Sequence, residues 1–129
     1  MRACDDAQVL MCRAHTDDRG MNMQKLERLA QDVGLALKHQ KLRLATAESC
    51  TGGMMAMLVT AVAGSSVWFE RGWVTYSNAA KVSELEVDPQ VLDTDGAVSR
   101  ACVLAMAQGA IRHSQAHVSL AIRGIAGPD

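Results

Sequence analysis

Short runs of strand-forming residues alternate along this chain with longer segments of helical periodicity, and no other feature restricts the fold as much. The strand-like segments are residues 42–48, 67–76 and 117–124. Helical segments separate them, and a strand that is joined to the next through a helix usually pairs with it in parallel. We therefore predict an α/β protein with three layers, α/β/α, and a central sheet that is at least partly parallel.

The first two helical segments differ in pattern. An amphipathic helix is predicted up to about residue 40, with apolar residues at Leu26, Leu29, Ala30, Val33 and Leu37. Residues 52–64, GGMMAMLVTAVAG, are so uniformly apolar that we expect a buried helix there, ended by Gly64.

Two further helices follow the second strand. Residues 78–87 predict a helix capped by Asn78, and Ser99 precedes another. The apolar stripe of this last helix is formed by Val103, Met106, Ala107, Ala110 and Ile111. Between the two helices we expect Pro89 to open a short turn, and Gly72 marks a β-bulge in the second strand.

The composition excludes several classes of partner. The 13 basic and 14 acidic residues nearly cancel, so the basic surface typical of proteins that bind nucleic acids or anionic membranes is not expected. Aromatic residues make up 3% of the chain, too few for a platform on which bases stack. The longest apolar run, residues 54–63, is too short to cross a membrane. We expect neither a nucleic acid nor a membrane as partner.

We interpret the chain as one domain with an extension. Residues 1–22 mix charges with isolated apolar residues and show neither period, which indicates a poorly ordered N-terminal extension, and residues 23–129 form the domain. The 4 cysteines form no Cys-x-x-Cys pair and have no histidine at metal-ligand spacing. We expect reduced thiols, no metal site and a cytoplasmic location, because the acidic N-terminus does not resemble a signal peptide.

Functional loops of such sheets gather at the carboxyl ends of the strands. Three loops qualify here: residues 48–53 (ESCTGG), 75–81 (TYSNAAK) and 123–129 (RGIAGPD). All three carry glycines or hydroxyl groups, so we expect them to form the site together.

Ser49 lies just before the Gly-Gly pair at which a helix is expected to begin. Unpaired backbone N–H groups at such a helix end could hold a phosphate or a developing oxyanion, so the position suits a nucleophile. A serine needs a base, and no histidine follows a strand-end loop in a suitable position. Lys81 is the remaining candidate, since a helix N-terminus and partial burial both favour its neutral amine, and Tyr76 could relay the proton.

The same residues have ordinary structural interpretations. Ser49 or Thr51 could cap a helix, Tyr76 could be a partly buried strand residue, and Lys81 could be a solvated charge. No spacing rule links this serine to this lysine. Taken alone, the residue chemistry favours the structural interpretations.

Four motifs, TAESCTGG, VWFERGWVTYSNAAK, GAVS and GIAGP, follow one another along the chain. In this order and spacing they resemble the CinA C-terminal domain family, a competence/damage-inducible-type family whose characterised members resemble nicotinamide-nucleotide amidases. The resemblance covers about residues 24–129. It implies an α/β/α homodimer that hydrolyses the carboxamide of nicotinamide mononucleotide to nicotinate mononucleotide and ammonia, without a metal or cofactor.

By this resemblance Ser49 matches the nucleophile, and Tyr76 and Lys81 match the residues that activate it. The ribose phosphate is expected against the backbone of the glycine-rich loop. The residues that we expect to bind the substrate are Cys50, Thr51, Gly52, Gly53, Ser77, Asn78, Arg123 and Gly124.

Two departures from the family pattern support a second hypothesis. Arg123 stands where the last family motif has threonine, and the sequence ends at Asp129, where family members continue into a further strand and helix. We therefore expect a truncated domain whose sheet is incomplete at its C-terminal end. The alternative to an active amidase is a degenerate, non-catalytic domain that binds a nucleotide or only dimerises.

Overall fold

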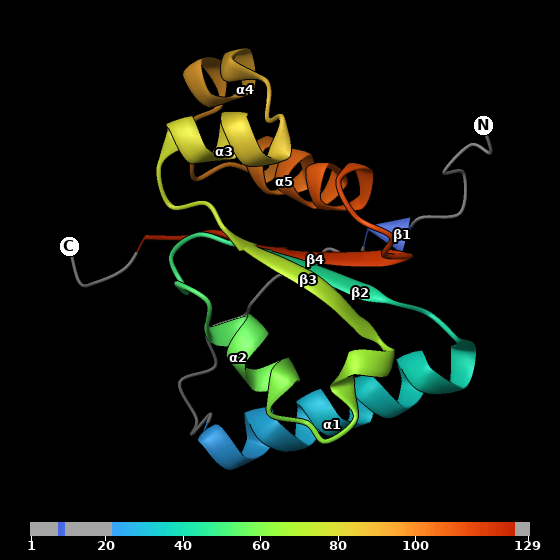
Figure 1. Cartoon of the computed structure of the whole chain (residues 1–129). Helices are drawn as coiled ribbons and strands as arrows, with labels where there is room; N and C mark the ends of the chain where they lie inside the picture. Colours follow the sequence, from blue (N-terminus) through green and yellow to red (C-terminus); the bar gives the residue numbers. More distant parts are fainter. Residues whose placement is uncertain (1–7, 10–21, 126–129) are drawn as a thin grey trace, which may run out of the picture.

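The structure, a computed structural model, describes residues 8–9 and 22–125. Its elements are β1 (Gln8–Val9), α1 (Met23–Gln40), β2 (Leu44–Glu48), α2 (Met54–Thr60), the 3-10 helix η1 (Ser65–Val67), β3 (Phe69–Val74), α3 (Asn78–Leu85), α4 (Pro89–Thr94), α5 (Arg100–Arg112) and β4 (Val118–Ile122). The described strands form one sheet in the order β1-β4-β2-β3, and all neighbours are parallel. Helices α1 and α2 cover one face and α3, α4 and α5 the other (Figure 1), which confirms the predicted α/β/α layers.

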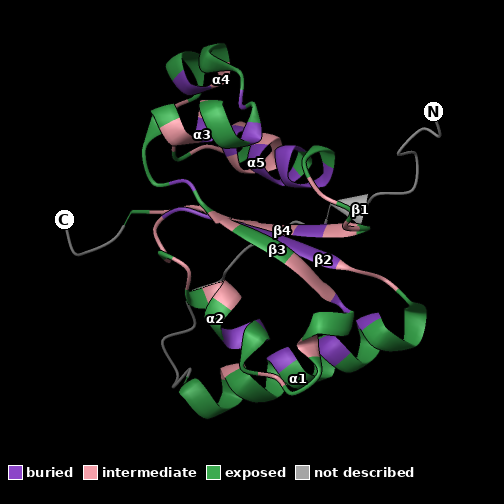
Figure 2. Ribbon diagram, viewed as in Figure 1, coloured by how far each residue is buried: buried purple, intermediate pink, exposed green. Residues whose placement is uncertain are grey.

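The central strand β2 is buried along its whole length (Figure 2). Side chains alternate between the faces of a sheet, so Ala45 and Ala47 join the core beneath α5, while Leu44 packs in the core formed with α1 and α2. Both faces are covered, so the polar residues Thr46 and Glu48 are buried as completely as the alanines of the strand. By the same alternation Glu48, the last residue, faces the α2 side.

The close packing of α3 against α5 depends on a glycine. A side-chain carbon at Gly109 of α5 would collide with the backbone carbonyl of Leu85 at the end of α3. Only a residue without Cβ allows the two helices to approach this closely. This contact holds α3, and with it Lys81, against α5.

The predicted helices on the α1 face are partly confirmed. Helix α1 has the expected bounds, but Leu29 and Val33 are exposed. The prediction of a buried helix over residues 52–64 is wrong, because α2 ends at Thr60 and only Leu58 and Val59 within it are buried. A uniformly apolar segment does not indicate which of its sides will be covered.

On the other face, the cap of α3 is Ser77 and not Asn78. The Ser77 hydroxyl accepts the N–H of Ala80 at 3.0 Å, and Asn78 is already the first helical residue. Pro89 begins the short helix α4 instead of a turn, with Asp88 as its cap. Serine and asparagine are both good caps, so residue type alone could not decide between Ser77 and Asn78.

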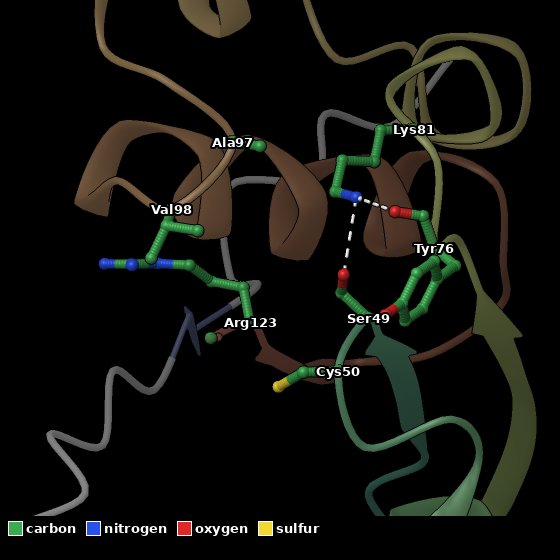
Figure 3. A pocket seen from close by; sticks show the side chains of 8 residues that line it. Ser49, Cys50, Tyr76, Lys81, Ala97, Val98 and Arg123 are labelled. Carbon is green, nitrogen blue, oxygen red and sulfur yellow. Dashed lines mark hydrogen bonds between the residues drawn. The ribbon is translucent and has the colours of Figure 1, made fainter. Parts of the chain in front are cut away.

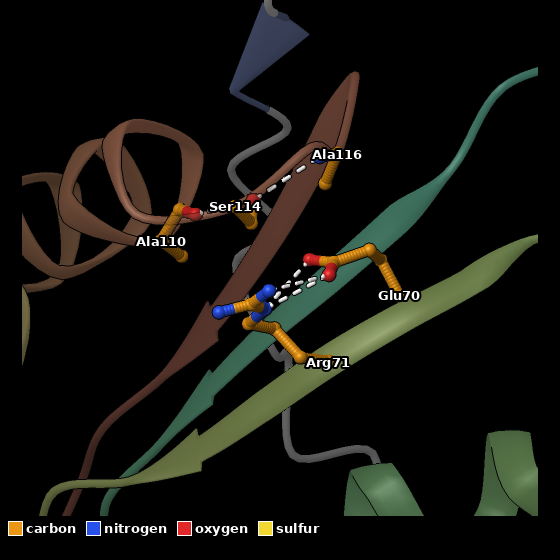
Figure 4. A network of polar contacts seen from close by, with 5 residues as sticks. All are labelled: Glu70, Arg71, Ala110, Ser114 and Ala116. Atoms are coloured by element: carbon orange, nitrogen blue, oxygen red, sulfur yellow. Dashed lines mark hydrogen bonds and ion pairs between the residues drawn. The ribbon is translucent and has the colours of Figure 1, made fainter.

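Helix α5 begins where the sequence predicts. Ser99 caps it by accepting the N–H of Cys102 at 3.0 Å. At its other end the Ser114 hydroxyl donates to the carbonyl of Ala110 at 2.6 Å and accepts the N–H of Ala116 at 3.1 Å (Figure 4). These two bonds turn the chain from α5 into β4.

The irregularity in β3 lies at Glu70 and not at Gly72. Leu44 is paired with Phe69 and Ala45 with Arg71, so Glu70 is the additional residue, while Gly72 pairs regularly with Thr46. The prediction of a bulge at the glycine is therefore wrong.

Strand β1 was not predicted. Gln8 and Val9 pair with Val118 and Ser119 along the outer edge of β4. Residues 1–7 and 10–21 of the predicted extension lie outside the described residues, so the domain boundary stays a prediction. Residues 126–129 also lie outside them, so the incomplete C-terminal end stays a prediction as well. Among the described helices, none is long and apolar enough to cross a membrane.

At the bulge, Glu70 accepts three hydrogen bonds of 2.8–2.9 Å from the guanidinium of Arg71 (Figure 4). These bonds, opposed in part by desolvation, hold the pKa of Glu70 below its ordinary value of 4.5. A lowered pKa in the folded state stabilises the protein above the pKa of the unfolded state, and this stabilisation is lost as the pH falls through the folded pKa.

We therefore predict that Glu70→Gln makes the free energy of unfolding depend less on pH under acidic conditions. The free energy of unfolding of the wild type should decrease as the pH falls below about 4.5, and the variant should lose less of it over the same interval. Urea titrations at several pH values measure this, with Glu84→Gln on the exposed face of α3 as control. Parallel profiles for wild type and Glu70→Gln would contradict the prediction.

Candidate active site

The carboxyl ends of β2, β3 and β4 meet at one edge of the sheet. Beyond the last paired residues, the N–H of Ser49 donates to the carbonyl of Ile122 at 3.0 Å, and the N–H of Thr75 donates to the carbonyl of Glu48 at 2.9 Å. These bonds align the first residues of all three strand-end loops. The loops that the sequence selected therefore lie side by side, as expected.

A small cavity of about 170 Å³ opens between these loops and the segment that joins α4 to α5 (Figure 3). Its lining includes one lysine and one arginine and no carboxylate. The lining residues are Ser49, Cys50, Tyr76, Lys81, Ala97, Val98, Arg123 and Gly124.

Lys81 lines this cavity and is buried, with 2% of its surface exposed. Its Nζ donates to the backbone carbonyls of Tyr76 at 2.7 Å and Thr75 at 2.9 Å, and to the hydroxyl of Ser49 at 3.4 Å. Among the described residues, no carboxylate lies within ion-pair distance of this amine. The interpretation of Lys81 as a solvated charge is wrong.

Ser49 is buried and does not cap a helix. The cap of α2 is Gly53, and in the described part of the chain Lys81 is the only hydrogen-bond partner of the Ser49 hydroxyl. Gly52 and Gly53 have φ values of 58° and 104°, in the left-handed region that glycine adopts most readily. This turn separates Ser49 from the helix that follows.

Glu48 fixes the loop that carries Ser49. Its carboxylate is fully buried and accepts three hydrogen bonds: from the Thr51 hydroxyl at 2.8 Å, and from the N–H groups of Met55 at 2.8 Å and Ala56 at 3.0 Å. A carboxylate at a helix N-terminus is stabilised by unpaired N–H groups and by the helix dipole. Glu48 therefore occupies the helix end that the sequence assigned to a ligand.

The backbone N–H groups nearest Ser49 remain open. The N–H of Gly52 donates to Ser49 and that of Met54 to Thr51, whereas those of Cys50 and Thr51 have no acceptor among the described residues. The expected anion donors are thus found directly after Ser49 and not in the first turn of α2.

Tyr76 contributes its backbone to the site more directly than its side chain. Its carbonyl accepts from Lys81, while the side chain is 68% exposed and its hydroxyl bonds no described residue. The ring lies on the Ser49 side of the cavity (Figure 3). The interpretation of Tyr76 as a partly buried strand residue is wrong.

The candidate substrate-binding residues divide into two groups. Cys50, Arg123 and Gly124 line the cavity. The others serve local structure: Thr51 bonds Glu48, Gly52 and Gly53 form the turn before α2, Ser77 caps α3, and Asn78 is exposed at its start.

Sequence reasoning missed three contributors to the site. Ala97 and Val98 line the cavity and belong to the GAVS motif, which could have indicated them. Glu48 could have been found as a carboxylate at the end of a buried strand. In α5, burial raises the pKa of the Cys102 thiol, and the charges of Lys81 and Arg123 oppose that rise.

A family model described as the CinA C-terminal domain matches residues 26–129. The chain belongs to the CinA C-terminal domain family. Nicotinamide-nucleotide amidohydrolase PncC of Escherichia coli K12 is 49% identical over 109 residues, which are 84% of this chain and 66% of that protein. A CinA-like protein of Syntrophotalea carbinolica is 46% identical over an alignment covering 100% of this chain and 33% of the relative. The chain thus spans slightly less than two thirds of the first relative.

Solved structures from the family share the fold. The competence/damage inducible protein CihA of Agrobacterium tumefaciens has a TM-score of 0.78 at 46% identity, with 81% of this chain and 63% of that chain covered. The competence damage-inducible protein A of Klebsiella pneumoniae has a TM-score of 0.79 at 38% identity, covering 81% and 65%. The α/β fold predicted from the family resemblance is confirmed.

We predict that Glu48→Gln destabilises the CinA domain. The carboxamide keeps one acceptor oxygen but turns an NH₂ group toward one of the three donors, so about 1–3 kcal/mol of the free energy of unfolding should be lost. Urea denaturation measures this loss. Glu84→Gln, an exposed change of the same type on α3, is the matched control, and equal stability of the two variants would refute the capping role of Glu48.

Proposed function

We propose that this CinA domain is an amidohydrolase that converts nicotinamide mononucleotide to nicotinate mononucleotide and ammonia. The observation that carries the proposal is the contact of the buried Lys81 amine with the Ser49 hydroxyl. The name of the Escherichia coli relative, nicotinamide-nucleotide amidohydrolase, supports the substrate class.

The surroundings of Lys81 suit a general base. A neutral amine has two N–H groups and one lone pair. The carbonyls of Thr75 and Tyr76 can accept both N–H groups, which leaves the lone pair for the O–H of Ser49. The Lys81–Ser49 distance of 3.4 Å is long, as catalytic hydrogen bonds often are before a substrate is bound.

The reaction then proceeds in two halves. The Ser49 oxygen attacks the carboxamide carbon while Lys81 takes the hydroxyl proton, and the N–H groups of Cys50 and Thr51 hold the oxyanion. When the C–N bond breaks, the proton on Lys81 passes to the leaving nitrogen and ammonia departs. Water, deprotonated by Lys81, attacks the resulting ester, which releases the carboxylate and restores the serine hydroxyl.

Tyr76 has a supporting role in this proposal. Its hydroxyl shares the proton as the serine is deprotonated, in addition to the backbone contact that its carbonyl makes with Lys81. Hydrolysis without a metal stays a prediction, as do the homodimer and the cytoplasmic location. Among the residues that the structure describes, no three His, Cys, Asp or Glu side chains are grouped as metal ligands would be.

We predict that ammonia release from nicotinamide mononucleotide depends on the Ser49–Lys81 pair. Ser49→Ala should lower kcat at least about 10³-fold, and Lys81→Met and Tyr76→Phe about 10²-fold or more, because each removes a group that acts on the transferred proton. Ammonia is measured with a coupled assay, and circular dichroism verifies that each variant folds.

Matched controls are Ser66→Ala and Lys38→Met, which change exposed residues outside the cavity. Both should retain wild-type activity. Wild type as inert as Ser49→Ala would instead favour the second hypothesis, a degenerate domain that binds or dimerises without turnover.

A further inference from the structure

Arg123 has an unusual position for a charged side chain in this cavity. It is half-buried in the lining, yet within the described part of the chain no carboxylate or carbonyl accepts a hydrogen bond from its guanidinium. Figure 3 shows the side chain extending past Val98, away from Ser49 and Lys81. Arginine presents a planar fork of donors, and a partly shielded fork without a partner is suited to a bidentate anion.

The size of the cavity places the rest of a nucleotide near this fork. Pockets that enclose whole drug-sized ligands measure about 300–1,000 Å³. The cavity here measures about 170 Å³, so it can take the reacting end of a nucleotide, while the remainder lies along the rim. The Arg123 side chain runs past Val98, which is 48% exposed, and away from Lys81 (Figure 3).

The N-terminus of helix α2, a second possible anion site, is already occupied. Phosphates often bind the N–H groups at a helix N-terminus, and the sequence placed the ribose phosphate against the glycine-rich loop. In the structure, however, Glu48 accepts the N–H groups of Met55 and Ala56, and the N–H of Gly52 donates to Ser49. A buried carboxylate at the start of α2 repels an anion there, whereas the lining of the cavity has no carboxylate and includes the permanently charged Arg123.

We propose that Arg123 binds the phosphate of the substrate and makes the enzyme select nucleotides over nucleosides. This inference rests on the proposed function, because it assumes a carboxamide nucleotide whose ring end reacts at Ser49. Arg123 is then a specificity-determining residue, in the position where the family motif has threonine.

The test compares nicotinamide mononucleotide with nicotinamide riboside, which has the same ring and carboxamide but no phosphate. The wild type should show a KM about 10- to 100-fold lower for the nucleotide. Arg123→Gln should raise the nucleotide KM toward the riboside value and so abolish the preference. Arg123→Lys keeps the charge without the fork and should give an intermediate preference. Arg28→Gln, on the exposed surface of α1, is the control and should preserve the full preference.

A binding measurement separates this inference from the proposed function. In the Ser49→Ala background, which cannot form the ester, calorimetry should give a dissociation constant about 10- to 100-fold lower for the nucleotide, and Arg123→Gln should remove the difference. If this result is obtained with a wild type that releases no ammonia, the proposed function fails and the role of Arg123 stands. Turnover without any preference for the nucleotide, equal affinity for both ligands, or binding of neither would overturn the role of Arg123.

Discussion

The buried carboxylate of Glu48 is the interaction on which the rest of the site depends. Alternation along β2 turns this last strand residue toward α2, where it accepts two N–H groups of the helix and the hydroxyl of Thr51. The chain between the strand and the helix is thereby fixed at both ends. Ser49 follows Glu48 directly, so its position relative to the sheet is determined by a bond that the reaction itself does not use.

A second constraint comes from the parallel sheet. All described strand pairs are parallel, so the loops after β2, β3 and β4 leave the same edge, and residues far apart in the sequence become neighbours. Lys81 reaches Ser49 because α3 packs tightly against α5 through Gly109. The arrangement explains how a lysine and an arginine come to line one cavity in a chain whose charges nearly cancel.

The layers and the strand-end site could be predicted from the sequence because hydrophobic periodicity and strand order are global properties. Local features were harder. Ser77 and Asn78 are both good caps, and only the start of α3 decides between them. Strand β1 has 2 residues, too few to show a hydrophobic period. Lys81 is held by two backbone carbonyls, and every residue has a carbonyl, so the residue types could not predict these bonds. That Glu48 occupies the N-terminus of α2 could be predicted only by someone who knew on which face of the sheet its side chain lies.

The backbone origin of these acceptors affects how this site can evolve. Since the Lys81 amine is held by the carbonyls of residues 75 and 76, its position is determined by the path of the main chain and not by the side chains there. A substitution of the Thr75 or Tyr76 side chain therefore leaves the carbonyls that hold the amine in place, although at Tyr76 it also removes the hydroxyl that shares the proton. A lineage could therefore acquire new substrates through substitutions at exposed lining residues such as Val98 while Ser49 and Lys81 stay in place, and the same separation makes such residues natural targets for directed evolution.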